Sequence, residues 1–279
     1  MEPAKSATKC ILTTVLLALA ATGGASPAKT ACRAACSAAV DPKAIDALER
    51  MGAYLREQPH FTLRTKSETD YILDTGQKAT IAATGELRAQ RPNKLRVETV
   101  SDRKHRAFFY DGKTFTIFSP ALGVYATVPV SGTLRELADT LTDKYGLQLP
   151  LVDLFRWGTD EADFDLITDA TYVGKAKIAG VDVDQYALRQ PGVDWQIWIE
   201  RGARPLPRKL QLTTTDDPAR PEYKLELTWD LAAQQLDAAF TFVPPKGTSK
   251  IAMADRETVR AQHELEARRT TEPKRGEAR

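Results

Sequence analysis

A long series of alternating segments, which begins at His60, constrains the fold more than any other feature of the sequence. In residues 60–71 and 78–88, apolar or small side chains alternate with charged or polar ones. Because successive side chains of a strand point to opposite faces, each segment predicts a strand with one buried and one solvated face. Further predicted strands are residues 95–98, 106–110, 114–118, 123–128, 170–178, 181–189, 195–201, 209–215, 223–229 and 240–243. Short turns such as Asp111-Gly112 and Pro191-Gly192 indicate an antiparallel meander of about eleven strands.

Helical patterns precede and interrupt the strands. Asp41-Pro42 combines a capping side chain with a proline in the first turn, and apolar residues recur at helical spacing from Ile45 to Leu55, before Pro59. A second helical stripe and a short apolar turn occupy residues 133–155. Since the apolar face of the first helix needs a partner, we expect a mainly β (α+β) domain, an unclosed and strongly curved antiparallel β-barrel wrapped around helices.

The amino-terminal segment has the pattern of a secretory signal. Two lysines precede an apolar run over residues 11–21, and small residues follow it. This order predicts a cleavable signal peptide over residues 1–25, with cleavage after Ala25 or after Ala28, and hence a periplasmic or secreted protein, of which we expect the former; a buried amino-terminal helix is the alternative. The rest of the chain is expected to comprise a flexible linker (26–40), the domain (41–245) and a mobile charged tail (246–279).

The three cysteines lie in or near this signal. Cys10 would leave with the signal peptide, and Cys32 and Cys36 remain four residues apart. In an oxidising compartment these two could form a disulfide, which would close a very small loop. Lipid anchoring at Cys32 is a second interpretation. Lys29 argues against it, because an apolar residue is expected at that position.

Composition and motifs argue against most catalytic and metal-binding classes. With 39 Lys+Arg and 37 Asp+Glu the net charge is +2, so no nucleic-acid-binding face is indicated. The sequence contains no glycine-rich phosphate loop, no nucleophile elbow and no HExxH motif. We therefore expect a protein that is not an enzyme and that needs no cofactor and no metal.

Three polar clusters leave alternatives open. The acidic residues within 160–169 lack the loop glycine and the terminal glutamate of a calcium hand, which favours a solvated loop. Asp182 and Asp184 lie on one face of a predicted strand, where paired carboxylates could exchange protons but exposed charges are the simpler interpretation. The basic residues 103–106 suit an anionic lipid surface or an acidic partner, or else a charged turn before a buried strand.

The predicted inner face combines large apolar residues with small ones. The small residues are Thr65, Ser67, Ala79, Ala83 and Gly85, and they either let a helix approach closely or leave a cavity. A packed core is the simpler alternative, whereas an apolar cavity could bury an acyl chain at about 0.8 kcal/mol per CH₂ group. The candidate cavity residues are Phe61, Leu63, Ile81, Leu87, Leu95, Val97, Phe115, Ile117, Trp195, Ile197 and Ile199.

Several segments together resemble DUF2092, a family of predicted periplasmic proteins of unknown function, over about residues 41–252. These segments are residues 41–55, 61–70, 87–96, 110–114, 194–200, 205–209 and 240–245. The turn at residues 91–95 and the closing Phe-Thr-Phe-Val-Pro-Pro are also typical of the wider group of lipoprotein carriers like LolA and LppX. The resemblance implies a LolA-like unclosed barrel that holds helices and an apolar cavity for lipid chains. No functional residue is carried over, because we match no position to the functional arginine of the carriers.

The expected function is that of a non-enzymatic periplasmic carrier, which shelters a lipid acyl chain or a lipidated peptide in the cavity. The helix of residues 41–57 and the segment of residues 133–155 would act as a plug or lid. The expected partners are this lipid or lipidated peptide and an inner- or outer-membrane protein, with no nucleic acid, and the protein is expected to be a monomer. The alternative function is an envelope sensor or scaffold that uses the same fold to bind a protein.

Overall fold

The computed structural model describes residues 40–147, 149, 151, 155 and 164–260. The predicted signal peptide, nearly all of the linker and all three cysteines lie outside the described residues, as do residues 160–163 of the acidic cluster. Expectations for these parts stay predictions. No helix within the described ranges is long and apolar enough to cross a membrane.

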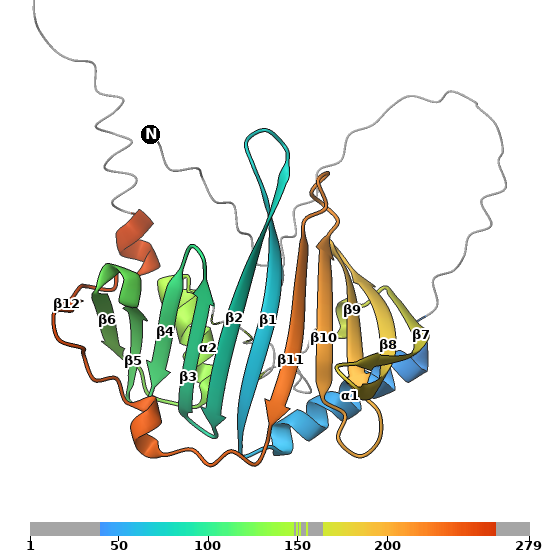
Figure 1. Cartoon of the computed structure of the whole chain (residues 1–279), viewed down its shortest axis with the longest axis horizontal. Helices are drawn as coiled ribbons and strands as arrows, with labels where there is room; N and C mark the ends of the chain where they lie inside the picture. Colours follow the sequence, from blue (N-terminus) through green and yellow to red (C-terminus); the bar gives the residue numbers. More distant parts are fainter. Residues whose placement is uncertain (1–39, 148, 150, 152–154, 156–163, 261–279) are drawn as a thin grey trace, which may run out of the picture.

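Twelve strands form one sheet in the described part of the chain (Figure 1). They are β1 (His60–Ile72), β2 (Lys78–Gln90), β3 (Lys94–Ser101), β4 (His105–Tyr110), β5 (Thr114–Ser119), β6 (Val124–Pro129), β7 (Asp169–Ile178), β8 (Val181–Gln190), β9 (Val193–Glu200), β10 (Pro207–Thr214), β11 (Glu222–Asp230) and β12 (Ser249–Lys250). Their order is β12-β6-β5-β4-β3-β2-β1-β11-β10-β9-β8-β7, and every neighbouring pair is antiparallel except β12 with β6. The end strands β7 and β12 do not pair, so the predicted unclosed, curved sheet is confirmed.

Two helices lie on the same side of this sheet, namely α1 (Pro42–Glu57) and α2 (Leu134–Tyr145) (Figure 1). The predicted cap of α1 is confirmed, since the Asp41 carboxylate accepts a hydrogen bond from the Lys43 backbone N–H at 3.0 Å. Thr133 and Glu136 form a capping box at the start of α2. Three short 3₁₀ helices are also present, namely η1 (Pro120–Leu122), η2 (Phe164–Leu166) and η3 (Asp237–Phe240), and residues 256–260 are helical as well.

One apolar cluster joins both helices to the concave face of the sheet. Leu48 and Met51 of α1, and Leu137 and Leu141 of α2, are completely buried in it. The helices supply the apolar surface that a one-sided sheet needs to cover its inner face. The expectation of a curved sheet wrapped around helices is therefore confirmed.

Residues 240–243 do not form the strand that the sequence predicts. The helix η3 ends at the first of them, and Phe242 packs on the outer face of the sheet against Phe109, Phe118 and Tyr125, with ring centroids 5.1 to 5.3 Å apart. The reason is topological. β11 already lies between β1 and β10, so the segment that follows it finds no free sheet edge beside it and crosses the outer face instead.

The chain keeps contact with the domain beyond Lys246, where the sequence predicts a mobile tail. β12 extends the sheet at β6, and the Ser249 backbone N–H donates to the Gly123 carbonyl at 2.8 Å. Further on, Arg256 Nη1 donates to the Thr142 carbonyl of α2 at 3.4 Å. The described segment up to Arg260 thus covers one edge of the sheet, while residues 261–279 lie outside the described part.

Candidate functional site

The concave side chains of β1, β2 and β3 change in kind partway along the strands. Leu63, Leu87 and Val97 stand side by side in register and are buried under the helices as part of the apolar cluster. The next two residues along the strands on the same face form the small-residue patch. We define it as Thr65, Gly85 and Thr99, which are paired in register, together with the pair Ser67 and Ala83. The same three strands therefore present an apolar half and a half with small or hydroxyl-bearing side chains.

A pocket of about 50 Å³ lies over the small-residue patch. Leu87, Val97 and Leu225 form its apolar side, and Tyr223 and Leu151 also line it. This volume suits a few water molecules, and an acyl chain is much larger. The pocket is therefore an opening that borders the apolar half, and a bound chain would have to extend beyond it.

Glycine at position 85 is required by close packing between the strands. A Cβ atom there would lie 2.6 Å from Thr65 Oγ1 and 3.3 Å from the Glu98 carbonyl oxygen. The shorter distance is well inside van der Waals contact, so any side chain at this position would displace its neighbours. The floor of the pocket is thus set by the pairing of three strands.

The structure places most of the predicted cavity residues in the packed core. Nearly all are buried in the apolar cluster, namely Phe61, Leu63, Leu87, Leu95, Val97, Phe115, Trp195, Ile197 and Ile199. Ile117 is half-buried and packs against this cluster. Ile81 is half-buried too, but it lies on β2 beyond the small-residue patch and outside the cluster. Only Leu87 and Val97 of the predicted set line the pocket.

The other pocket residues were missed as site candidates for two reasons. Small inward residues such as Thr65 and Gly85 were noted in the sequence, but smallness alone does not distinguish a pocket from close packing. Tyr223 and Leu225 come from β11, which pairs with β1 across more than 150 residues of chain. No local pattern predicts that pairing, so only the fold brings them to the patch.

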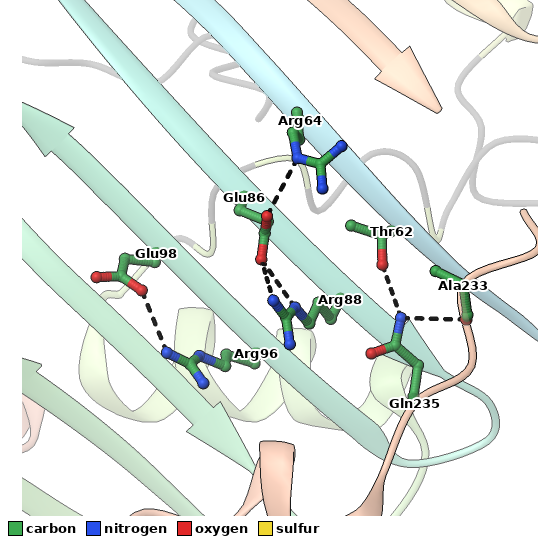
Figure 2. A network of polar contacts seen from close by, with 8 residues as sticks. All are labelled: Thr62, Arg64, Glu86, Arg88, Arg96, Glu98, Ala233 and Gln235. Carbon is green, nitrogen blue, oxygen red and sulfur yellow. Dashed lines mark hydrogen bonds and ion pairs between the residues drawn. The ribbon is translucent and has the colours of Figure 1, made fainter. Parts of the chain in front are cut away.

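Charged side chains of the same strands are paired on the outer face (Figure 2). Arg64 Nε lies 3.3 Å from one oxygen of Glu86, and Arg88 Nη2 lies 2.7 Å from the other. Glu98 accepts from both His105 and Arg96, and the hydrogen bond from His105 is the largest cause that lowers the pKa of this carboxyl. Glu86 also lines the pocket, but its carboxylate points away to Arg64 and Arg88 on the outer face. The small-residue patch itself is therefore uncharged.

Arg91 is a half-buried cation to which the sequence pattern assigned no individual role. Its Nε donates to the Gln58 carbonyl at 3.2 Å and its Nη2 to the Leu55 carbonyl at 3.4 Å, at the carboxyl end of α1. The guanidinium also lies 5.6 Å from the centroid of the Phe155 ring. Burial, followed by repulsion from Arg56, lowers the pKa of Arg91. This side chain fastens α1 to the turn between β2 and β3.

As far as the structure describes them, the polar clusters singled out in the sequence do not assemble into a reactive site. Asp182 pairs with Lys177 at 2.8 Å, and Asp184 accepts from the Tyr172 hydroxyl at 3.1 Å, so each of these carboxylates has its own partner. In the basic cluster at residues 103–106, the His105 ring is hydrogen-bonded to the Glu98 carboxylate on the outer face. The residues described by the structure contain no group of three or more side chains that could hold a metal ion.

Comparison with known proteins identifies one family. A family model described as "Predicted periplasmic protein (DUF2092)" matches residues 44–254. The location in this description is the one predicted from the amino-terminal signal. No curated protein matches the chain.

Solved structures show a distant likeness. An uncharacterized conserved protein from Thermus thermophilus is 10% identical, with a TM-score of 0.43, and the match covers 75% of this chain and 99% of that one. The Mycobacterium tuberculosis lipoprotein LppX is 12% identical, with a TM-score of 0.44 and coverage of 70% and 98%. A LolA superfamily protein from Nitrosomonas europaea is 12% identical, with a TM-score of 0.34 and coverage of 71% and 97%.

Proposed function

Because the chain belongs to the DUF2092 family of predicted periplasmic proteins, we propose that it is a non-enzymatic periplasmic carrier. It shelters a lipid acyl chain or a lipidated peptide against the concave face of its sheet. The observation that carries this proposal is the pocket over the small-residue patch, which borders the apolar cluster beneath the helices. Large apolar area next to a preformed opening is typical of a binding site for an amphiphile.

The energetics require the bound chain to reach past the pocket. Each CH₂ group removed from water contributes about 0.8 kcal/mol, so a chain of about 16 carbons contributes on the order of 10 kcal/mol before ordering costs. Leu87, Val97 and Leu225 continue from the pocket into the apolar cluster. A chain that enters at the small-residue patch would lie along this surface and exchange contacts with the side chains that now cover it.

The segment after α2 is the nearer of the two proposed covers. Leu151 lines the pocket, and Phe155 stacks on Phe61 with ring centroids 6.3 Å apart. By contrast, α1 is held by Leu48, buried in the cluster, and by the two hydrogen bonds from Arg91. We therefore propose that, of the predicted cover at residues 133–155, the part after α2 that contains Leu151 and Phe155 acts as the lid, and that α1 remains as the plug.

The absence of catalysis in this proposal rests on the chemistry of the pocket. Thr65, Ser67 and Thr99 supply hydroxyls there, but the residues that line the pocket include no histidine, and the carboxylate of Glu86 is bound on the outer face. A hydroxyl needs an adjacent base to act as a nucleophile. A screen of lipid esters for hydrolysis is expected to show no turnover.

The proposal is tested by measuring the lipid bound to protein from its native compartment and the uptake of fatty acid by delipidated protein. Native mass spectrometry and lipid extraction of protein purified from periplasm are expected to reveal a bound lipid, and delipidated protein is expected to take up a fluorescent fatty acid. Ala83→Phe, which fills the small-residue patch, should abolish uptake. Ala82→Phe on the opposite face of the same strand is the matched control and should leave uptake unchanged.

Two outcomes would defeat the carrier proposal: wild-type protein that is empty and takes up no fatty acid, or Ala83→Phe protein that takes it up like the control.

A second candidate function, an envelope sensor or scaffold, is supported by two exposed apolar side chains on the segment that crosses the outer face. Leu236 and Val243 are 78% and 77% exposed. A pull-down that returns one stoichiometric protein partner and no lipid would favour this second function.

A further inference from the structure

A buried indole without a partner lies on the concave face. Trp195 of β9 is 7% exposed, and its Nε1 has no hydrogen-bond partner, the one buried side-chain nitrogen or oxygen of the described residues in this state. Trp229 shows the normal arrangement, because its Nε1 donates to the Pro207 carbonyl at 2.7 Å. A buried tryptophan N–H almost always finds an acceptor, since an unmet donor costs free energy.

The surroundings of Trp195 do not favour a bound water as the missing acceptor. Leu188 and Leu212 lie directly opposite it on the neighbouring strands, and Val193 and Ile197 flank it on its own strand face. All four side chains are apolar, whereas a buried water needs two to four polar partners. The N–H is therefore left for an acceptor that arrives with a mostly apolar molecule.

The indole lies within reach of a molecule that enters at the pocket. Leu212 pairs with Trp195 on one side and with Tyr223 on the other, and Tyr223 lines the pocket. Neighbouring strands are about 4.8 Å apart, so β9 lies about 10 Å from β11 across the concave face. An acyl chain that spans the pocket and this half of the sheet covers that distance easily.

We propose that Trp195 Nε1 donates a hydrogen bond to an uncharged carbonyl oxygen of the bound amphiphile, in an acyl ester or an acyl amide. This inference rests on the proposed carrier function and specifies the ligand. A carboxylate is disfavoured, because a charge buried among apolar side chains without a cation is costly. The nearest polar neighbour in register, Gln190, is diagonal to Trp195 and already has an interaction of its own.

The experiment compares four ligands of equal chain length on full-length mature protein. Displacement of the fluorescent probe N-phenyl-1-naphthylamine is measured with methyl laurate, lauramide, laurate and dodecane, for wild type and for Trp195→Phe. The variant keeps the aromatic ring and removes the donor, so the ester and the amide should bind about five- to tenfold more weakly, with dodecane unchanged. Trp198→Phe, on the opposite face of β9, is the control and should alter none of the four affinities.

Thermal unfolding distinguishes a role of Trp195 as a hydrogen-bond donor to the ligand from a role in packing. Without ligand, Trp195→Phe loses no hydrogen bond, so it should melt only slightly below wild type, by the amount due to the contacts that the smaller ring gives up. Wild type that binds all four ligands equally, or Trp195→Phe that binds ester and amide like wild type, would overturn this inference and leave the carrier proposal standing. Wild type that binds none of the four would overturn both.

Discussion

The apolar half of the concave face and the small-residue patch share β1, β2 and β3, yet only the apolar half is sealed by the helices. Leu63 and Leu87 belong to the cluster that includes α1 and α2, whereas the residues that line the pocket include none from either helix. One part of the face is therefore covered by helices, and the next part is bordered by a pocket. The change from large apolar to small side chains occurs between Leu63 and Thr65, which are successive residues on the concave face of β1.

The largest expected difference between the two halves is in stability. Leu48→Ala, in α1, removes a completely buried side chain and should lower the free energy of unfolding by about 3 kcal/mol. Ser67→Ala, in the small-residue patch, should change it by less than about 0.5 kcal/mol. Denaturant titration followed by circular dichroism measures both. Equal losses for the two variants would show that the patch is as much a part of the core as the helices are.

The second effect concerns how α1 is attached to the sheet. Arg91→Ala should cost about 2 kcal/mol, because it removes a charged donor from two carbonyls at the end of α1. Arg56→Ala is the control, since this exposed arginine lies in the last turn of the same helix. Hydrogen exchange should accelerate in α1 of the Arg91 variant and remain slow in α2. Uniform acceleration throughout the domain would mean that Arg91 supports the whole fold and does not act specifically on α1.

The alternation of side chains predicted the sheet well, because it reports directly which face of each strand is buried. It predicted the candidate site poorly for the same reason. Large inward residues such as Phe61 and Ile197 have identical patterns whether they face a ligand or a helix, and here they are buried in the cluster that includes both helices. The pairing of β11 with β1, which brings Tyr223 to the pocket, depends on contacts distant in sequence and has no local signal.

A third, smaller effect tests why the patch is made of small residues. Gly85→Ala should lower the free energy of unfolding by about 1 kcal/mol, since the new methyl group meets Thr65 Oγ1. Adding Thr65→Ala removes that oxygen and should recover part of the loss, a coupling that a double-mutant cycle detects. If the two substitutions are simply additive, the glycine is not required by cross-strand packing, and its smallness would have to be explained by the pocket alone.

The smallest expected effect comes from the ion pairs on the outer face of the sheet, which should contribute little to stability both behind the apolar half and behind the small-residue patch. Asp194 of β9 is bound by Arg189 Nε at 2.6 Å and by Arg220 Nη2 at 3.2 Å, and the hydrogen bond from Arg189 is the main cause that lowers the pKa of this carboxyl. Both arginines are more than half exposed, which limits the pair to less than about 1 kcal/mol.

The pH dependence of Asp194→Asn follows from the direction of that shift. A carboxyl whose pKa is lower in the folded state stabilises the fold above the unfolded value of about 3.9, and this stabilisation is lost as pH falls through the folded value. Asp194→Asn should therefore be slightly less stable than wild type at pH 7, and the two should converge at an acidic pH well below the unfolded value. Urea titrations at both pH values measure the difference. A gap that persists at low pH would mean that Asp194 acts through packing beside Trp195, and the two faces of β9 would then not be independent.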